Sequence, residues 1–457
     1  MSEIREARLQ KANSLLKKGF ASYAESFKIS HTSQFLFQKF DYLGDGQEED
    51  FSVSIAGRVM AKRVMGKIAF FTICDQEGQI QLYLDKRIIN SNLENQKLLS
   101  FEDIKEIVDI GDWIGVFGTI KKTNKGELSI KVEKWEMLSK SLQPLPDKWH
   151  GLTDIEKRYR QRYLDLIVNP HSKNVFKTRA KCISFIRKWL DSKNFLEIET
   201  PILQSEAGGA EARPFITHHN TLDIPLYLRI ATELHLKRMV VGGFEKVYEL
   251  GRIFRNEGIS TKHNPEFTSV EIYQAFSNYI DMMDLTEELI KDTVADACGS
   301  LLINYQNKKI DFSKPWLRIS MKEIVKKYTG IDFDSFRGDF QTAKQAVKSI
   351  NVELSNKINT IGRLLNEVFE QKVEAELVEP TFVIDYPIEI SPLARPHLDN
   401  KEMVQRFELF IAGRELANAF SELIDPVDQR ERMQLQQSLR DEGDFEAHCI
   451  DEDFLNA

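Results

Sequence analysis

The sequence has few cysteines, no long apolar run and no excess of positive charge. Its 457 residues include only Cys74, Cys182, Cys298 and Cys449, and no two of these form a CxxC pair. This usage argues against a zinc-binding domain or a disulfide framework and is typical of a reducing compartment. No apolar run approaches the ~18 residues of a membrane span, and no signal peptide is evident. We therefore expect a cytoplasmic protein with no membrane partner.

Charge and size limit the possible classes further. Lys and Arg number 62 against 70 Asp and Glu, which gives a formal net charge of −8. Proteins that coat nucleic acid are usually basic, so any contact with RNA must use local patches. Hydrophobic residues make up 42% of the chain, which is enough for sizeable cores. The length predicts two or three domains at roughly 100 to 200 residues each.

The first third of the sequence predicts a helical extension followed by a small barrel. Residues 3–27 have the apolar spacing of an amphipathic helix, and a polar stretch after them is typical of a hinge. Alternating apolar residues over 51–138 then predict five strands, with a helix over 92–108 between the third and the fourth. This order favours an oligonucleotide-binding (OB) barrel, although another small β-barrel has the same pattern. We place the extension at 1–45 and the barrel at 46–140.

A joint and a larger mixed unit follow the barrel. Residues 141–152 contain two prolines and a tryptophan, which favour a fixed linker. Residues 153–457 are too many for a second small barrel. Within them, 176–201 predict a long helix and a short strand, 278–303 predict a helix, and 316–380 are largely helical in pattern. We therefore expect an α+β fold.

Charged residues crowd one pair of predicted strands. KVYELGRIF (246–254) is strand-like and places Arg255 at its end, and FTSVEIYQAF (267–276) is the returning strand. The two-residue period puts Glu271 and Tyr273 on one face and apolar residues on the other. The planar guanidinium of Arg255 suits a phosphate or a carboxylate. The alternative is a plain hairpin in which a nearby glutamate pairs with Arg255.

The residues around this pair resemble a known family. FRNEG, HNPEFT and EIY, within 254–273, resemble the second signature motif of class II aminoacyl-tRNA synthetases, in the form found in lysyl-tRNA synthetases. SEAGGAEARPF (205–215) resembles the substrate-closing loop of that family, and RFELFIAGRELANAFSELIDPVDQ (406–429) resembles the segment before its third motif. The helix that ends near Pro201 resembles the first motif, which lies at a dimer interface. The resemblance spans essentially the whole chain, barrel included.

The resemblance implies a fold, a reaction and its partners. A class II catalytic domain over 153–457 would have helices around an antiparallel sheet, and an OB-fold domain would bind the anticodon. The protein would be a homodimer that activates L-lysine with ATP to lysyl-adenylate and transfers the lysyl group to tRNA(Lys). Arg255 is implied as the catalytic residue, because it would bind the α-phosphate while the lysine carboxylate attacks in line.

The ligand positions of the family carry over residue by residue. Those implied for ATP are Arg255, Glu257, His263, Asn264, Phe267, Glu408 and Glu415. Those implied for lysine are Gly209, Glu233, Glu271, Tyr273, Asn418 and Glu422. Phe267 would stack on adenine, although a lone phenylalanine is also typical of a core. The acidic set favours a cationic substrate, whereas the aspartyl enzyme of the same subclass would place basic groups there.

Glu408 and Glu415 are the implied Mg²⁺ ligands, because Mg²⁺ prefers carboxylate oxygens together with substrate phosphates. If residues 412–413 form a two-residue hairpin turn, these two carboxylates share one face of the hairpin. Asn418 and Glu422 have the opposite parity to Glu415 and can join them only through a bulge or other break after it. The alternative is a helix, on which all four residues also align.

The barrel is implied to read the anticodon. Phe70 and Gln81 match strand positions that contact the anticodon in this family, and Glu127 is implied with them. RNA bases would be splayed out and stacked on aromatic side chains. The alternative is that Phe70 belongs to the core of the barrel. The local positive patch would consist of Lys62, Arg63 and Lys67.

The family continues past the last resembling segment into a third motif, a glycine-rich strand that ends in a GxDR-like arginine. The printed 457 residues end before it and contain no GxDR. We therefore expect the chain as printed to adenylate lysine poorly. One alternative is a ligase that attaches lysine to a protein, which the barrel disfavours. Another is a non-catalytic tRNA-binding or dimerising protein, which the intact Arg255, Glu408 and Glu415 disfavour.

Overall fold

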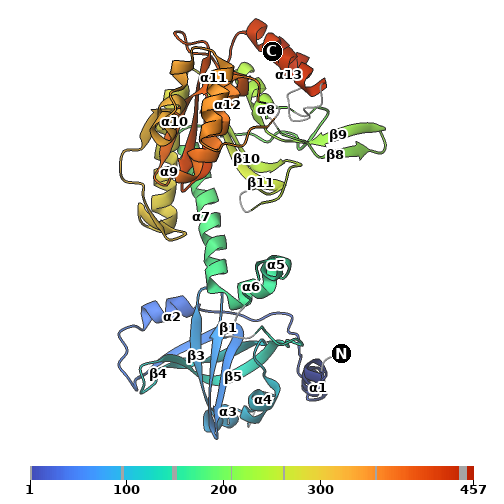
Figure 1. Cartoon of the computed structure of the whole chain (residues 1–457). Coiled ribbons are helices and arrows are strands. Elements are labelled where there is room, and N and C mark those ends of the chain that lie inside the picture. The colour runs from blue at the N-terminus through green and yellow to red at the C-terminus, as the bar shows by residue number, and fades with distance from the viewer. Residues whose placement is uncertain are drawn as a thin grey trace. The chain divides into compact units, whose positions relative to one another are not determined.

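The computed structural model divides into two compact units, Met1–Asn174 and Val175–Ala457 (Figure 1). It describes residues 3–93, 97–146, 152–206, 208–210, 212–260, 263–355, 358–441 and 450–457. No helix in these described ranges is both long enough and apolar enough to cross a membrane. The domain boundaries proposed from the sequence stay predictions.

The first unit is built around a closed barrel of five strands, whose neighbours follow the order β1-β2-β3-β5-β4. The strands are β1 (Glu48–Met65), β2 (Ile68–Cys74), β3 (Gln79–Asp85), β4 (Trp113–Lys122) and β5 (Leu128–Ser139). Two helices, α3 (Lys86–Ser91) and α4 (Phe101–Ile107), connect β3 to β4, where the sequence predicted one helix. Residues 94–96 of that predicted helix lie outside the described residues. The five strands and the helical connection are confirmed.

Alternation along each strand decides which side chains fill the barrel. On β2, Ala69, Phe71 and Ile73 are buried, whereas Phe70 and Thr72 are only partly covered. Neighbouring side chains of a strand point to opposite faces. Phe70 therefore lies on the outer face, and the alternative that it belongs to the core is wrong. Each fully buried phenylalanine or isoleucine on the inner face contributes about 1.5–3 kcal/mol through lost apolar exposure.

The N-terminal helix is shorter than predicted. α1 spans Glu3–Lys17 instead of 3–27, and the chain turns at Gly19, whose φ is +77°. Glycine adopts this left-handed conformation at little cost, so it ends the helix despite the apolar spacing that continues. A second helix, α2 (Ser33–Lys39), follows, and the hydroxyl of Thr32 caps its first turn.

Three helices follow the barrel: α5 (Ile155–Arg160), α6 (Arg162–Val168) and α7 (Pro170–Ser192). The fully buried carboxylate of Asp165 accepts hydrogen bonds from Arg158 and from Asn169, each at 2.7 Å. Arg162 also pairs with it. One buried carboxylate therefore links α5 to α6. Residues 147–151 of the predicted linker lie outside the described residues.

The second unit contains several sheets. A four-stranded sheet, ordered β14-β15-β16-β17, comprises β14 (Leu317–Ser320), β15 (Thr381–Pro387), β16 (Met403–Ile411) and β17 (Arg414–Phe420). A sheet ordered β11-β10-β6 comprises β6 (Leu196–Glu197), β10 (Lys246–Phe254) and β11 (Glu266–Gln274). The smaller elements are β7 (Leu203–Gln204), β8 (Ile216–His219), β9 (Ile224–Leu228), β12 (Leu302–Tyr305) and β13 (Lys308–Asp311). Most pairings are antiparallel, and β14 runs parallel to β15.

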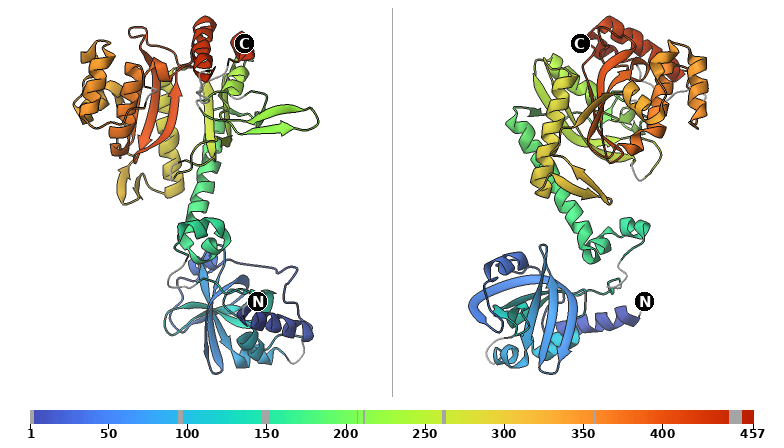
Figure 2. Two further views of the ribbon diagram at one scale, coloured as in Figure 1. Left: turned by 45° about the vertical axis from the view of Figure 1, so that its right-hand side comes forward. Right: turned by 60° about the vertical axis from the view of Figure 1, so that its left-hand side comes forward.

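Helices cover both faces of the four-stranded sheet. The described helices of this unit after α7 are α8 (Glu233–Val241), α9 (Tyr279–Cys298), α10 (Met321–Thr329), α11 (Phe340–Ser349), α12 (Ile361–Lys372), α13 (Pro426–Asp441) and α14 (Glu452–Asn456). Met283 of α9 packs with Phe407 on one face of the sheet, and Leu364 of α12 packs with Val404 on the other. Figure 2 shows α9 and the α10–α12 group on opposite sides of these strands. The α+β class is confirmed.

Candidate active site

Strands β10 and β11 present the predicted charged face. They pair antiparallel along their whole length. Val270 and Ile272 of β11 pack against Tyr248 in an apolar core. Glu271 and Tyr273 therefore face the other side, as their parity predicted. The Tyr273 hydroxyl donates to Oε2 of Glu271 at 3.2 Å.

Arg255 follows directly after β10 and is held by main-chain and ring contacts. Its amide donates to the carbonyl of Pro265 at 2.8 Å, and its Nε donates to the carbonyl of Ile230 at 3.4 Å. The guanidinium carbon lies 5.4 Å from the centre of the Phe267 ring. Among the described residues no carboxylate lies within ion-pair distance of Arg255, which disfavours the plain paired hairpin. Phe267 is half-buried beside this guanidinium and has the strand parity of Glu271 and Tyr273, which disfavours the alternative of a core aromatic.

The loop between β10 and β11 carries three predicted ATP residues. Glu257, His263 and Asn264 are all exposed. His263 Nδ1 lies 3.0 Å from the Ser260 hydroxyl, a contact within the same loop. These three residues follow Arg255 closely in the sequence. The structure shows no described contact between any of them and Arg255.

β16 and β17 form the predicted hairpin. Ala412 and Gly413 have φ values of +56° and +71°, the conformation of a two-residue turn that matches strand twist. The helical alternative for this segment is wrong. Phe410 pairs with Glu415, but Leu409 pairs with Ala417, so the strand carries a bulge between them.

The bulge decides which side chains share a face. Glu408 pairs with Asn418, and both lie on the same side as Glu415, because the extra residue shifts the parity of β17. Phe407 and Ala419 of the opposite parity pack in the core beneath α9. The break that the sequence required after 415 is therefore present.

Two residues that the sequence did not single out hold Glu408. The Tyr386 hydroxyl donates to its Oε2 at 2.9 Å, and an Arg406 Nη donates to its Oε1 at 2.6 Å. Nε of Arg406 also donates to Oδ1 of Asn418 at 3.2 Å. Arg406 lies two residues before Glu408 on one strand face, and that spacing is a signal that could have found it.

Glu415 lies close to Glu408 and is incompletely compensated. Desolvation and the neighbouring Glu408 carboxylate raise the pKa of Glu415, whereas Arg406 and Arg255 oppose the shift. The described residues supply no group of three or more metal-ligating side chains. The pair can still hold a hard cation together with oxygens from a ligand.

The residues of β11 that are predicted to bind lysine lie close to the start of α8. The amide of Thr232 donates to Oε1 of Glu271 at 3.0 Å. Desolvation raises the pKa of Glu271, the Thr232 amide opposes this, and the Glu233 carboxylate adds to it. Burial raises the pKa of Tyr273 well above its usual value, and the carboxylates of Glu233, Glu271 and Glu422 act in the same direction. These acidic groups therefore surround one phenol.

Gly209 lies against the same helix. Its φ is +87°, and an added Cβ would stand 3.1 Å from Cβ of Glu233 and 3.2 Å from Cβ of Ala231. A larger residue would be strained and would push on α8. The glycine therefore lets the loop approach the carboxylate.

Lys237 joins two of the predicted lysine-binding acids, and the sequence did not single it out. Its Nζ lies 2.6 Å from Oε1 of Glu233 and 2.6 Å from Oε2 of Glu422. Glu233 and Lys237 are four residues apart on α8, which is a common spacing for exposed pairs. Only the fold shows that this pair is buried and meets Glu422.

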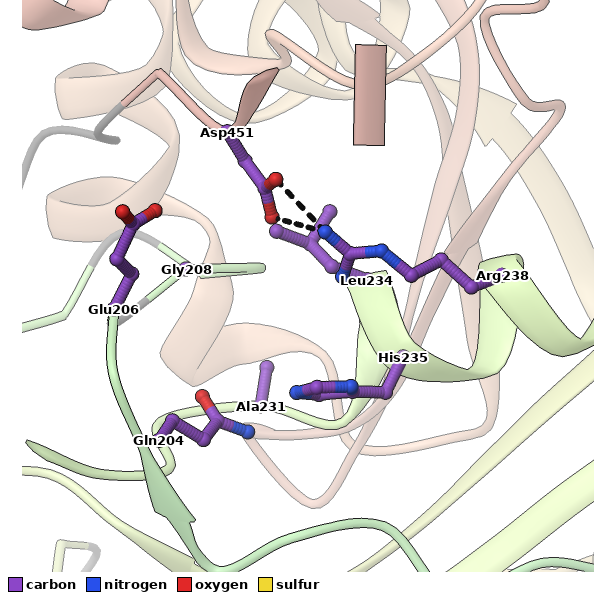
Figure 3. Close-up of a pocket in the computed structure, with 8 residues that line it drawn as sticks. All are labelled: Gln204, Glu206, Gly208, Ala231, Leu234, His235, Arg238 and Asp451. Carbon is purple, nitrogen blue, oxygen red and sulfur yellow. Dashed lines mark hydrogen bonds and ion pairs between the residues drawn. The ribbon is translucent and has the colours of Figure 1, made fainter. Parts of the chain in front are cut away.

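A small pocket opens beside the acidic groups, on the neighbouring face of α8. Its lining is Gln204, Glu206, Gly208, Ala231, Leu234, His235, Arg238 and Asp451 (Figure 3). Arg238 donates to both carboxylate oxygens of Asp451, at 2.8 and 2.6 Å. Desolvation and the Arg238 charge lower the pKa of His235. Arg238 and Asp451 are paired with each other in this pocket, so the pocket marks a seam that holds the segment before α14 against α8.

The predicted anticodon residues lie on the outer surface of the barrel. Phe70 packs edge-on against Tyr83, with 5.6 Å between ring centres. Gln81 Oε1 lies 2.9 Å from the hydroxyl of Ser129 on the neighbouring strand. Glu127 is exposed at the start of that segment. A ring and an amide are thus presented on adjacent strands, and Ser129 fixes the amide.

The predicted positive patch of the barrel needs one correction. Lys62 is half-buried, and its Nζ donates to the carbonyls of Lys105 and Val108, each at 2.6 Å. A cation at the end of α4 is favourable there, because the last carbonyls of a helix lack partners. Arg63 and Lys67 are exposed. Lys62 therefore stabilises the α4 end and is not part of an open patch.

Comparisons with known proteins agree with this layout. Residues 154–457 match the family described as tRNA synthetases class II (D, K and N). Residues 53–138 match the OB-fold nucleic acid binding domain, which decides between the barrel types left open above.

Closely similar proteins carry one name. The chain is 92% identical over its whole length to the lysine–tRNA ligase of Prochlorococcus marinus strain MIT 9312, of which it covers 89%. It is 61% identical over its whole length to the lysine–tRNA ligase of Prochlorococcus marinus strain MIT 9211, of which it covers 91%. The chain therefore belongs to the class II tRNA synthetases, in the group of the lysine–tRNA ligases.

Proposed function

We propose that the protein activates L-lysine with ATP and transfers the lysyl group to tRNA(Lys). The observation that carries this proposal is the meeting of Glu233, Glu271 and Glu422 around Tyr273 in the unit that also carries Arg255. Such a cluster suits a substrate with two ammonium groups, because carboxylates and a phenol can accept hydrogen bonds from both. Relatives that share the whole length of the chain bear the matching name.

The first step forms lysyl-adenylate. A carboxylate oxygen of lysine attacks the α-phosphorus of ATP, the bond from that phosphorus to the bridging oxygen breaks, and pyrophosphate leaves. Arg255 stabilises the charge that develops on the α-phosphate, and Phe267 beside it offers a face for the adenine. Catalysis here depends on position and charge more than on a covalent group.

The second step transfers the lysyl group. A hydroxyl of the terminal ribose of tRNA attacks the lysyl carbonyl carbon, the bond to the phosphate oxygen breaks, and AMP leaves. The barrel takes part by binding the anticodon with Phe70, Gln81 and Glu127. Support comes from their positions on the outer surface and from the OB-fold match. Stacking on an aromatic face is the usual basis of such contacts.

Mg²⁺ fits the pair Glu408 and Glu415. The two carboxylates lie on one strand face and repel each other, as the raised pKa of Glu415 indicates. When bound, the ion would neutralise phosphate charge. Oxygen ligands from the protein and from substrate phosphates are its usual environment.

We also propose a homodimer in the cytoplasm. Apolar side chains around the predicted first motif are exposed: Val175, Phe176, Leu196, Ile202 and Leu203 are between 46% and 53% accessible. Exposed apolar side chains along such a motif are typical of a surface that another chain covers. Sedimentation of the purified protein would measure the assembly.

Lysine-dependent exchange of pyrophosphate into ATP tests the proposal. We expect exchange with lysine and not with ornithine, arginine or aspartate, followed by charging of tRNA(Lys). Tight tRNA binding without lysine-dependent exchange would favour the non-catalytic alternative. Exchange with transfer to a protein instead of tRNA would favour the protein ligase. Running the 457-residue chain in this assay tests the expectation of weak adenylation.

A further inference from the structure

Lys237 is a buried cation beneath the proposed lysine pocket. Its ammonium contacts one oxygen of Glu233 and one oxygen of Glu422, both at 2.6 Å. The Lys237 side chain is 9% exposed, whereas that of Glu422 is 36% exposed. Glu422 therefore has a covered end at Lys237 and an open side toward solvent. A lysine this deeply buried needs charged partners, because an unpaired buried ammonium is costly.

Two aromatic rings also lie near the Lys237 ammonium. Nζ of Lys237 lies 5.3 Å from the ring centre of Phe420 and 5.7 Å from that of Phe454. Phe454 belongs to α14, and the segment before α14 is fixed to α8 by the pair of Arg238 and Asp451 (Figure 3). The Lys237 ammonium is thus buried, with two carboxylates and two aromatic rings close to it.

We propose that Lys237 is a fixed counter-ion that holds Glu233 and Glu422 charged and oriented for the ammonium groups of the substrate. It is a positioning residue, because it acts on the substrate through the two glutamates. This inference rests on the proposed function and deepens it, since it explains how several carboxylates can share a pocket before lysine arrives.

The groups that face the pair come from three elements. They are Glu233 and Lys237 on α8, Glu271 and Tyr273 on β11, and Glu422 after β17. Without Lys237, three carboxylates would stand together, and the described residues would place no other cation among them. Like charges in one site force protons onto one of the groups. A protonated glutamate binds an ammonium far less well than an ionised one.

Glu422 is the group that we expect to titrate. Desolvation and the nearby Glu233 raise the pKa of Glu422 to about 7, and Lys237 opposes the increase. Removing Lys237 removes this opposing charge, so the pKa of Glu422 should rise further. Lysine affinity should then fall as the pH drops, with a midpoint above that of the unaltered protein.

A rival account gives the opposite result. If Lys237 merely occupies the place of the substrate ammonium, its removal leaves a space between two carboxylates that a substrate ammonium can fill. Lysine should then bind more tightly at every pH. The two accounts therefore differ in the sign of the effect, which a binding measurement decides.

The experiment compares Lys237→Met and Lys237→Arg with the unaltered protein. Lysine dissociation constants are measured by calorimetry between pH 6.5 and 8.5, and KM and kcat for lysine are taken from pyrophosphate exchange where it occurs. We expect Lys237→Met to weaken lysine binding about 10- to 100-fold at pH 7 and to recover in part toward pH 8.5. Lys237→Arg should stay within about fivefold, because it keeps the charge.

The matched control is Lys291→Met. Lys291 pairs with Glu287 at 2.6 Å in the same four-residue spacing on α9, and it contacts the Trp316 ring. This substitution should leave lysine affinity unchanged. ATP affinity checks that the second unit is folded, and Lys237→Gln replaces Lys237→Met in the same test if the latter does not fold.

The outcomes separate the two proposals. Equal or tighter lysine binding by the uncharged variants across the pH range overturns the role of Lys237, while lysine binding by the unaltered protein keeps the proposed function. Failure of the unaltered protein to bind lysine overturns the proposed function itself. Weaker lysine binding by Lys237→Met with a pH midpoint above that of the unaltered protein, together with near-normal binding by Lys237→Arg, supports the role of Lys237 as a counter-ion.

Discussion

Two carboxylates of the proposed site have particular neighbours. Glu408 is held by Arg406 and Tyr386, and Glu271 accepts the amide of Thr232. Charged side chains seldom remain buried without such partners. The partners fix the carboxylates before any ligand binds, which lowers the reorganisation needed during the reaction.

Arg255→Lys tests the planar guanidinium beside Phe267. Lysine keeps the positive charge but loses the planar fork that can contact two phosphate oxygens. We expect lysine-dependent pyrophosphate exchange to fall about 100- to 1,000-fold in kcat, the range for loss of a preorganised donor. The KM for lysine should change much less, because Arg255 faces the phosphate.

The matched control for this prediction is Arg252→Lys. Arg252 is an exposed arginine of β10, three residues before Arg255. Its substitution should leave exchange within about twofold, since surface changes have small effects. Equal losses in the two variants would contradict the assignment to Arg255.

At the residue scale, period and composition predicted a good part of the layout. The parity of Glu271 and Tyr273 followed from the two-residue period of one strand, and the structure confirms it. Lys237 could not be found this way, because a Glu–Lys pair four residues apart is usually solvent-exposed. Only the tertiary fold brings Glu422 to it. Lys62 was misplaced for the same reason, since a strand lysine gives no sign of the carbonyls that it meets.

At the scale of elements, one bulge changes which face of a strand its later side chains occupy. Regular pairing after Glu415 would place Asn418 on the core face. The extra residue in β17 brings Asn418 to the face that also carries Glu408. The sequence required such a break but could not locate it, because many positions after the turn would satisfy the same parity. Gly19 gives a converse case. The apolar spacing predicted a helix over 3–27, but the left-handed conformation of this one glycine ends the helix earlier.

Asp165→Asn tests the helical joint after the barrel. The carboxylate of Asp165 has no solvent exposure and is shared by Arg158, Arg162 and Asn169. The substitution removes the buried negative charge with which both arginines pair. We expect the free energy of unfolding of the first unit to fall by about 3 kcal/mol, the lower range for breaking a buried pair. Urea unfolding at pH 7 measures this, with Glu156→Gln as an exposed control that should change stability by less than about 0.5 kcal/mol.

The same carboxylate predicts a pH dependence. Burial alone would raise the pKa of Asp165, but hydrogen bonds from Asn169 and Arg158 hold it well below its usual value. A pKa lowered by folding gives stability that is present above the unfolded pKa, near 4, and is lost as the pH falls through the folded value. The free energy of unfolding of the unaltered protein should therefore fall in acid, and Asp165→Asn should lack this part of the change. If the free energy of unfolding of the variant fell in acid as much as that of the unaltered protein, the role of Asp165 would be contradicted.

At the scale of the whole molecule, the chain separates two tasks. The barrel has its own core in the first unit, and the acidic pocket with Arg255 belongs to the second. The sequence predicted a change from strands to mixed elements after the barrel, and the domain boundaries drawn there stay predictions. The net charge gives no sign of the proposed RNA surface, because Phe70 and Gln81 on the outer face need no large basic field to stack or hydrogen-bond with a base.

Phe70→Ala tests whether the tasks are separable. Adenylate formation needs only lysine, ATP and the second unit, whereas charging also needs the tRNA held by the barrel. Loss of a ring that stacks on a base costs about 1–3 kcal/mol, which corresponds to roughly 5- to 150-fold in tRNA affinity. Lysine-dependent exchange should be unchanged. Phe35→Ala, an exposed phenylalanine on α2 of the same unit, is the matched control and should leave tRNA affinity intact. Equal losses in both variants would point to a diffuse aromatic surface, and a loss of exchange in Phe70→Ala would show that the barrel and the acidic pocket are coupled before tRNA binds.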